Sequence, residues 1–287
     1  MNPQSGGSAS RASRWVDRAV RSTRRTLVAA GACLLSSLLV FCQPGSRTPG
    51  TGGPDSARIP GGMNENASGS AGPAGDPYAA PRARMVEEQL RRRDIRDPRV
   101  LEVMGRVPRH EFVSASQRRL AYADGPLPIG YDQTISQPYI VALMTQLARP
   151  RAGGRALDIG TGSGYQAAVL AGLTGEVYSI EILCPLANEA RARLARLGYA
   201  NVEVRCGDGY RGWPEQAPFD AIILAAAPDH IPPALIDQLA PGGHLVLPVG
   251  EYEQELVDVE KRPDGSVIKR NVIPVRFVPM TGESERR

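Results

Sequence analysis

The alternation of short apolar runs with helical stretches limits this chain's fold more than any other feature. Five such runs follow one another at 155–159, 176–181, 202–206, 219–225 and 244–249. Helical patterns fill most of the gaps, and Gly198 is placed to end the helix of 184–198. Strands that alternate with helices join through right-handed crossovers, so we expect a mostly parallel sheet with helices on both faces.

Both ends of this α/β pattern carry further elements. Amphipathic periodicity predicts helices from Arg82, over 97–105 and over 137–148, with Asp97 capping the second and Gly105 ending it. After the last apolar run, Asp264-Gly265 separates two alternating segments, the pattern of a β-hairpin. The sheet should therefore end in antiparallel strands.

Composition divides the chain into three parts. Residues 43–81 hold nine glycines and seven prolines with little to bury, so we interpret them as a disordered linker to a folded domain at 82–287. In 1–42, six arginines precede the apolar run 27–41, as in a secretory signal, and that run is short for a membrane-spanning helix. Export or anchoring through 11–42 is therefore a hypothesis.

Charge and cysteine content argue against several classes of protein. The part 82–287 has 26 basic and 26 acidic residues, and a nucleic-acid binder would concentrate basic charge there. Its two cysteines, Cys184 and Cys206, show no paired spacing of a disulfide framework or a metal knuckle, which suits a reducing compartment. The three histidines share no ligand spacing, so we expect no metal site.

The stretch "LDIGTGSGY" follows the first apolar run and opens a helix, where α/β sheets bind ligands. Its glycines are Gly160, Gly162 and Gly164. A dinucleotide-binding loop needs its third glycine one position later, where Tyr165 stands. The spacing therefore argues against NAD.

Acidic residues at the ends of successive strands indicate another nucleoside. Glu181 lies 21 residues after Gly160 and can accept hydrogen bonds from both ribose hydroxyls. Asp158 adds a second carboxylate, and Asp208, beside Gly209, can meet an adenine edge. A ligand that carries positive charge and no phosphate fits this set, which favours S-adenosylmethionine. Each feature alone also suits a tight turn or a helix cap, but together and in this order they favour cofactor binding.

From about Met85 to Met280 the chain resembles the protein-L-isoaspartate O-methyltransferase family. The resemblance is carried by several stretches, of which "QTISQP" is the most specific; others are "LPIGYDQTISQP", "LDIGTGSGYQAAVLA", "GDGYRGW", "APFDAIILAAAP", "LAPGGHLVLPVG" and "VRFVPM". It implies a Rossmann-like class I methyltransferase that repairs isoaspartyl sites in damaged proteins. Transfer of a methyl group to the free carboxylate would start that repair through a succinimide, with S-adenosylhomocysteine as the second product.

The segment 130–140 has two interpretations. As structure, Ser136 is a plausible N-cap, with Gln137 and Pro138 in the first turn. The resemblance implies that Ser136 is the active-site residue and that Gln133, Thr134 and Ile135 position the substrate, and both interpretations can hold at once. An isoaspartyl carboxylate is ionised at neutral pH, so such a site requires alignment and no base.

Other functions stay open at this point. Methyltransferases that act on base amines tend to carry "[DN]PP[YF]" after the fourth strand, where this chain has "LAAAP", and a catechol acceptor would want metal ligands beyond Asp229 and His230. An exported nucleoside-binding protein without turnover is a third alternative. We expect a cytoplasmic monomer that contacts a membrane, if at all, only through 27–41.

Overall fold

The computed structural model describes residues 75–286. The signal-like leader and most of the proposed linker, residues 1–74, lie outside this range, so the predictions for them remain predictions. Among the helices of the described range, none has the length and apolar character needed to cross a membrane.

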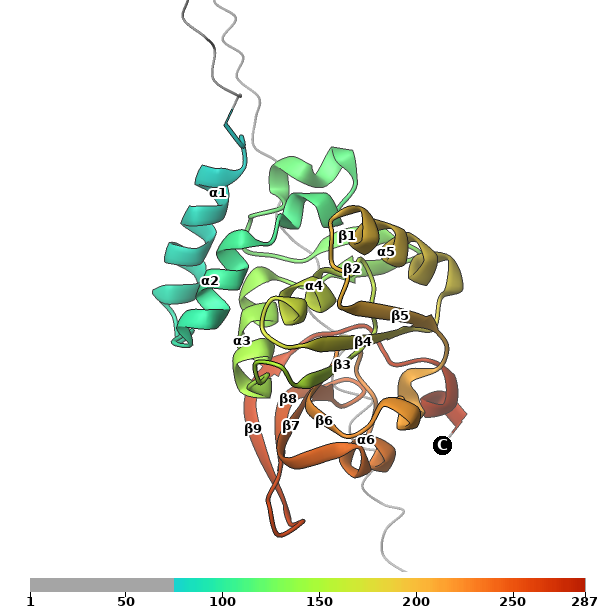
Figure 1. Ribbon diagram of the computed structural model, residues 1–287. Coiled ribbons are helices and arrows are strands. Elements are labelled where there is room, and N and C mark those ends of the chain that lie inside the picture. The colour runs from blue at the N-terminus through green and yellow to red at the C-terminus, as the bar shows by residue number, and fades with distance from the viewer. Residues whose placement is uncertain (1–74, 287) are drawn as a thin grey trace, which may run out of the picture. The chain divides into compact units, whose positions relative to one another are not determined.

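A seven-stranded sheet forms the centre of the domain, in the order β5-β4-β3-β6-β7-β8-β9 (Figure 1). The first five strands in this order run parallel, and β8 and β9 are antiparallel to their neighbours. The fold prediction is thus confirmed, including the hairpin at Asp264-Gly265. The strands are β3 (Arg155–Ile159), β4 (Glu176–Glu181), β5 (Val202–Cys206), β6 (Phe219–Leu224), β7 (Leu239–Val249), β8 (Gln254–Lys261) and β9 (Val267–Val275).

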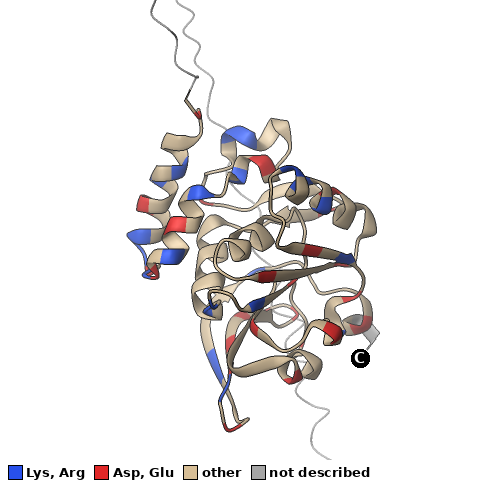
Figure 2. Cartoon of the chain, viewed as in Figure 1, with Lys and Arg blue, Asp and Glu red and all other residues tan. Residues whose placement is uncertain are grey.

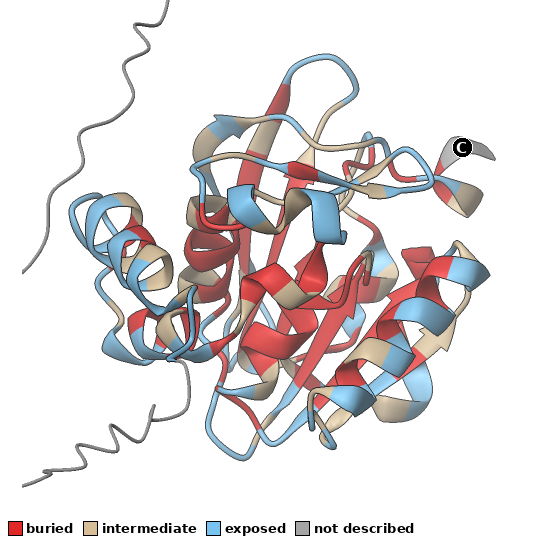
Figure 3. Cartoon of the chain, turned by 90° about the horizontal axis from the view of Figure 1, so that it is seen from above, coloured by how far each residue is buried: buried red, intermediate tan, exposed pale blue. Residues whose placement is uncertain are grey.

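Both faces of the sheet are covered because alternate strand residues enter different cores. Ala156 of β3 packs in a core with the helices α3 (Pro138–Ala148), α4 (Tyr165–Ala171) and α5 (Cys184–Arg196). Its neighbour Leu157 packs on the opposite face with α6 (Pro233–Asp237) and the 3-10 turn η5 (Gly209–Arg211). Figure 3 shows the buried residues gathered on the strands and on the helix sides that face them.

Two predicted boundaries differ from the structure. Strand β7 begins at Leu239 and not at His244, because Leu239 already pairs with Phe219 of β6; a register shift separates this pair from the next one, Ala221 with His244. The helix α2 (Pro98–Arg106) begins as predicted, with Asp97 accepting a hydrogen bond from the backbone N–H of Arg99, but passes through Gly105. It ends one residue later because the residue before Pro108 takes an extended conformation.

The folded part begins earlier than the composition suggests. Helix α1 (Ala79–Arg84) starts inside the proposed linker and continues as the π-helical segment η2 (Met85–Arg91). The last residues assigned to the linker therefore belong to the domain. Proline at 77 and 81 does not prevent this, because proline is tolerated in the first turn of a helix. The short elements that complete the chain are η3 (Arg109–Phe112), η4 (Ala115–Leu120), β1 (Leu127–Gly130), β2 (Gln133–Ile135), η6 (Pro214–Gln216) and η7 (Gly282–Arg286).

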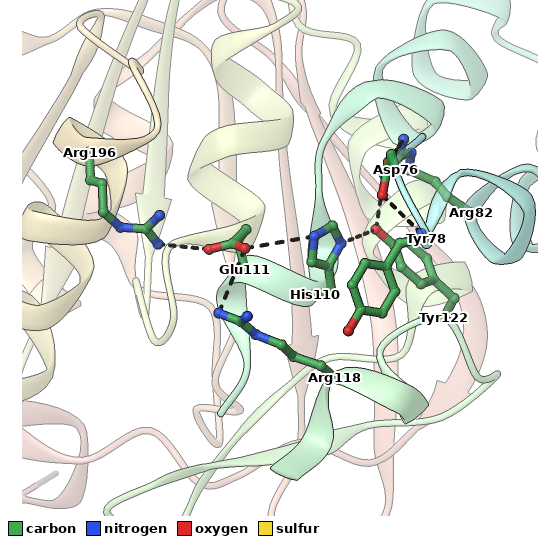
Figure 4. A network of polar contacts seen from close by, with 8 residues as sticks. All are labelled: Asp76, Tyr78, Arg82, His110, Glu111, Arg118, Tyr122 and Arg196. Carbon is green, nitrogen blue, oxygen red and sulfur yellow. Dashed lines mark hydrogen bonds and ion pairs between the residues drawn. The ribbon is translucent and has the colours of Figure 1, made fainter. Parts of the chain in front are cut away.

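A network of polar contacts fastens this N-terminal part to the domain (Figure 4). The guanidinium of Arg82 bonds the carboxylate of Asp76 at 2.7 Å and the hydroxyl of Tyr122 at 3.2 Å. Tyr122 in turn bonds Nδ1 of His110 at 2.8 Å, and the ring of Tyr78 stacks on that histidine at 3.9 Å between centroids. These contacts connect η3 to helix α1 and to the residues just before it.

Cys184 and Cys206 form a disulfide, which corrects the expectation that they are unpaired. Residue 206 ends β5 beside Glu181 of β4, and α5 begins three residues after Glu181. Neighbouring strands thus bring the start of α5 next to the end of β5, with the two Cα atoms 5.0 Å apart. The spacing of 22 residues carries no sign of this contact, because the sheet order creates it.

Candidate active site

A cavity of about 320 Å³ opens at the carboxyl ends of the parallel strands. Its walls come from the ends of β3, β4, β5 and β6, from the small β1–β2 hairpin, and from residues 278–281 near the C-terminus. Strands β4 and β5 lie on one side of β3 in the sheet, and strands β6 and β7 lie on its other side. The cavity therefore lies at the topological switch point, where sheets of this kind bind ligands.

The glycine loop forms the floor of the cavity. Gly160 and Gly162 line it, with φ values of 87° and 53° that favour glycine. The backbone N–H of Gly160 donates to the carbonyl of Ile180 at 2.8 Å, which fastens the loop to β4. Gly164 has a φ of 89° but does not line the cavity; a Cβ there would lie 3.1 Å from Leu194 of α5. It serves the packing of α4 against α5.

Glu181 stands at the end of β4 and lines the cavity while only 6% exposed. Its Oε2 accepts a hydrogen bond from the N–H of Gly162 at 2.8 Å, and its Oε1 accepts one from the N–H of Leu183 at 3.0 Å. Each oxygen keeps a second lone pair. The carboxylate is thus fixed by backbone groups and still able to accept two hydroxyl donors.

Asp158 lies beneath the glycine loop, fully buried and outside the cavity lining. Its Oδ2 accepts a hydrogen bond from the hydroxyl of Ser179 at 2.8 Å, and that hydroxyl meets the hydroxyl of Thr161 at 2.6 Å. Its Oδ1 has no hydrogen-bond partner among the described residues. Burial raises the pKa of Asp158 to about 7, the nearby charge of Glu181 adds to this, and the bond from Ser179 opposes it. The structure therefore places Asp158 as a support of the loop.

Asp208 and Gly209 follow β5 and line the cavity. Oδ1 of Asp208 accepts a hydrogen bond from the N–H of Tyr210 at 2.9 Å, and Oδ2 accepts one from the N–H of Glu283 at 2.8 Å. This carboxylate therefore joins the end of β5 to the C-terminal segment. A Cβ on Gly209 would lie 2.3 Å from Ile159, so the close approach to β3 requires glycine here.

The β1–β2 hairpin forms the opposite wall. Gln133, Thr134, Ile135 and Ser136 all line the cavity, so the structure brings together every residue predicted in this segment. At the hairpin's tip, the hydroxyl of Tyr131 donates to Glu189 of α5 at 2.9 Å.

The predicted helix cap at Ser136 is wrong. Helix α3 begins at Pro138, its N-cap is Gln137, and no side chain caps it. Proline at the first position has no N–H to satisfy, which lessens the need for a capping hydroxyl. The hydroxyl of Ser136 makes no hydrogen bond with any described residue while the residue lines the cavity. It is thus available to a ligand.

Sequence reasoning missed one residue that touches this wall. Arg109 is fully buried and donates from Nη2 to the carbonyl of Ser136 at 2.8 Å. Its position between apolar residues of "VPRHEF" is the only local signal that it could be buried. The sequence also did not predict that residues 278–281 line the cavity, because no motif near the glycine loop indicates that they do.

The chemistry available here is alignment of an anionic acceptor with a bound nucleoside. Glu181 and Asp208 place acidic groups on one side, and the hairpin side offers hydroxyls and amides together with the carboxylate of Asp132. In the described range no three His, Cys, Asp or Glu side chains are grouped to hold a metal ion. Asp229 and His230 bond to one another outside the cavity lining, which counts against a catechol-type metal site. Acidic and basic residues are interspersed over the domain (Figure 2).

The fold and this site define a Rossmann-like class I methyltransferase. Residues 81–285 match the model of the family described as protein-L-isoaspartate(D-aspartate) O-methyltransferase. The chain belongs to that family.

Similar proteins agree with this assignment. The chain is 56% identical over 227 residues to "Protein-L-isoaspartate O-methyltransferase 2" of Syntrophobacter fumaroxidans, covering 75% of this chain and 92% of the relative. A solved protein-L-isoaspartate O-methyltransferase superposes with a TM-score of 0.65 at 29% identity, covering 70% of this chain and 66% of that one. Another, described as a beta-aspartate methyltransferase from Plasmodium falciparum in complex with S-adenosyl-L-homocysteine, gives 0.61 at 28% identity, covering 70% and 98%.

Proposed function

We propose that this protein transfers a methyl group from S-adenosylmethionine to the free carboxylate of L-isoaspartyl residues in damaged proteins. The observation that carries the proposal is a cavity bounded by two different walls. On one side the fixed carboxylate of Glu181 is ready for a ribose, and on the other the hydroxyl of Ser136, which bonds to no described residue, is ready for an acceptor.

The residues of the cavity fit this cofactor. Gly162 leaves room for close approach of a ligand to the loop, since a side chain there would already meet Ile129 at 3.3 Å. Glu181 has two lone pairs for the ribose, and Asp208 lies at the wall nearest the C-terminal segment, where we place the adenine. When bound, S-adenosylmethionine supplies an electrophilic methyl group on a positively charged sulfur.

The protein's own part in the reaction is orientation. The isoaspartyl carboxylate needs no base, because its ordinary pKa of about 3 to 4 leaves it ionised at neutral pH. Ser136 donates a hydrogen bond that directs one oxygen of this carboxylate, and Thr134 and Gln133 hold the peptide on either side. Alignment at near-attack distance can account for much of the acceleration. The neighbouring backbone nitrogen then attacks the methyl ester and closes a succinimide as methanol leaves, and hydrolysis of the succinimide restores part of the normal aspartate.

Methylation of a defined peptide tests this function. The protein is incubated with methyl-labelled S-adenosylmethionine and either an isoaspartyl peptide or the same peptide with normal aspartate. We expect base-labile label in the isoaspartyl peptide alone. Base-stable label would indicate another class of methyltransferase, and binding of S-adenosylhomocysteine with no transfer to any acceptor would indicate a nucleoside-binding protein.

Domain organisation and location complete the proposal. We propose that a leader at 1–42 and a Gly/Pro-rich linker precede a monomeric catalytic domain. S-adenosylmethionine is made in the cytoplasm, which favours a cytoplasmic enzyme; the signal-like leader and the disulfide of Cys184 and Cys206 favour an oxidising compartment. Mass spectrometry of the native N-terminus, with cell fractionation, distinguishes these locations, and light scattering tests the monomer.

A further inference from the structure

Arg109 connects three parts of the molecule from a fully buried position. Its Nε donates to the carbonyl of Ala121 at 2.7 Å and its Nη2 donates to the carbonyl of Ser136 at 2.8 Å. The centre of its guanidinium lies 4.8 Å from the ring centroid of Tyr165, the first residue of α4. Ser136 and Tyr165 both line the cavity. Arg109 therefore lies directly behind the wall that we assign to the acceptor.

No carboxylate of a described residue forms an ion pair with the guanidinium of Arg109. Burial lowers the pKa of its guanidinium, and the groups that oppose this are Tyr165 and Tyr122, not acids. An arginine stays charged in proteins even so. Its Nη1 is buried and has no hydrogen-bond partner in the described part of the chain. A buried charge of this kind destabilises a fold unless something else balances it.

The backbone that carries Arg109 is itself held firmly. Its neighbours on η3 take part in the network of Figure 4: His110 bonds Tyr122 at 2.8 Å, and Glu111 bonds Arg196 of α5 at 2.9 Å. The guanidinium is therefore fixed from its own side as well as by its two carbonyl partners. A fixed charge can favour one form of a ligand over another, because it does not have to reorganise when the ligand binds.

We propose that Arg109 is a positioning residue for the acceptor: it fixes Ser136 from behind and supplies the buried positive charge that selects an anionic carboxylate over a neutral group. The proposal rests on the function proposed above, in which the isoaspartyl carboxylate is the anion brought to this wall. The fixed backbone of Ser136 sets the direction of its hydroxyl, and the unbalanced charge makes the wall favourable to a negative ligand.

The test compares two peptides that differ only in charge. An isoaspartyl peptide and the corresponding isoasparaginyl peptide, whose carboxamide is neutral, are titrated into the protein saturated with S-adenosylhomocysteine. Dissociation constants are measured by calorimetry for the wild type and for Arg109→Gln, Arg109→Lys and Arg93→Gln. Arg93 is the matched control, since its guanidinium also lies over an aromatic ring, Tyr139, at 4.5 Å, but pairs with Asp124 at the surface.

We expect the wild type and Arg93→Gln to bind the anionic peptide at least tenfold more tightly than the neutral one. Arg109→Gln should reduce that preference to about twofold or less, with affinity for S-adenosylhomocysteine changed less than threefold. Arg109→Lys should keep most of the preference and still lower kcat about tenfold, because one ammonium cannot reach both carbonyls in the guanidinium's geometry.

A merely structural arginine would give a different pattern. It would weaken both peptides and the nucleoside in the same proportion, and the preference of Arg109→Gln for the anion would equal that of the wild type. Either result overturns the proposal. Should Arg109→Gln fail to fold, Arg109→Lys decides alone, and loss of the preference in that variant overturns it as well. A wild type that methylates no isoaspartyl peptide refutes the proposed function; the peptide dissociation constants can be measured whether or not a methyl group is transferred.

Discussion

Replacement of Asp158 by asparagine should remove the part of the pH dependence of stability between pH 5 and 8 that this carboxyl causes. The carboxyl is fully buried, its Oδ1 lacks a hydrogen-bond partner among the described residues, and its pKa is raised from 3.8 to about 7. The folded protein therefore keeps this proton over a range where the unfolded chain has lost it. Stability must fall as the pH rises from 3.8 through 7, because the folded state binds more protons there.

The size of the effect follows from the two pKa values. Each unit of pKa difference corresponds to about 1.4 kcal/mol, so the full penalty is about 4 kcal/mol once the pH is well above 7. Between pH 5 and 8 the loss amounts to about 2 to 3 kcal/mol. Asparagine resembles the protonated acid in shape and charge and does not titrate, so the variant should lack this loss.

Urea unfolding of the ligand-free protein measures the difference in unfolding free energy between Asp158→Asn and the wild type at each pH. That difference should move by about 2 to 3 kcal/mol in favour of the variant from pH 5 to pH 8. Asp264→Asn is the control: hydrogen bonds from Ser266 lower the pKa of this exposed carboxyl, so it is ionised throughout the range and its difference should stay flat. Parallel profiles for Asp158→Asn and the wild type would refute the reasoning.

Three further predictions concern the cavity and the disulfide. Ser136→Ala should lower kcat for an isoaspartyl peptide about tenfold or more while the Kd for S-adenosylhomocysteine, measured by calorimetry, changes less than twofold, because its hydroxyl makes no hydrogen bond with a described residue and is assigned to the acceptor; an unchanged kcat would contradict the assigned role. Glu181→Gln should weaken S-adenosylhomocysteine about 10- to 100-fold, since an amide replaces a charged acceptor of the N–H of Gly162 and of the ribose; an unaltered Kd would remove Glu181 from the nucleoside site. Replacement of Cys184 and Cys206 together by serine should lower the unfolding free energy by about 3 kcal/mol, because the disulfide closes a loop with a sequence separation of 22. Dithiothreitol should lower the unfolding free energy of the wild type by the same amount and leave that of the variant unchanged. An equal response of both proteins would show that the disulfide does not form in solution.

Local patterns in the sequence were sufficient for the elements that form the sheet and the floor of the cavity. Strands β3 to β6 have apolar runs bounded by turn residues, and the glycine loop and Glu181 take their places from the βαβ connection itself. The positive φ values at Gly160 and Gly162 are conformations that glycine adopts at low cost. Such features depend on residues close in sequence, which is why they could be predicted.

Features that depend on contacts between residues distant in sequence could not be predicted in this way. Ser136 has the residue type of a helix cap, but its hydroxyl is left for the cavity because the pairing of β1 with β2 fixes its backbone and Arg109 holds its carbonyl. Arg109 itself looks like a surface residue in a chain rich in arginine. Cys184 and Cys206 meet only because β4 and β5 are neighbours. Arg109 lies 27 residues before Ser136, and Cys184 lies 22 residues before Cys206.

The small β1–β2 hairpin has a consequence for kinetics. Ile129 lies against Gly162 of the nucleoside floor, and the same hairpin carries Ser136 toward the acceptor, with its tip fastened to α5 by the bond between Tyr131 and Glu189. We therefore expect the nucleoside to bind before the damaged polypeptide and to leave after it. Initial-rate measurements should then show an ordered sequence of binding and release, and a random order would contradict this expectation.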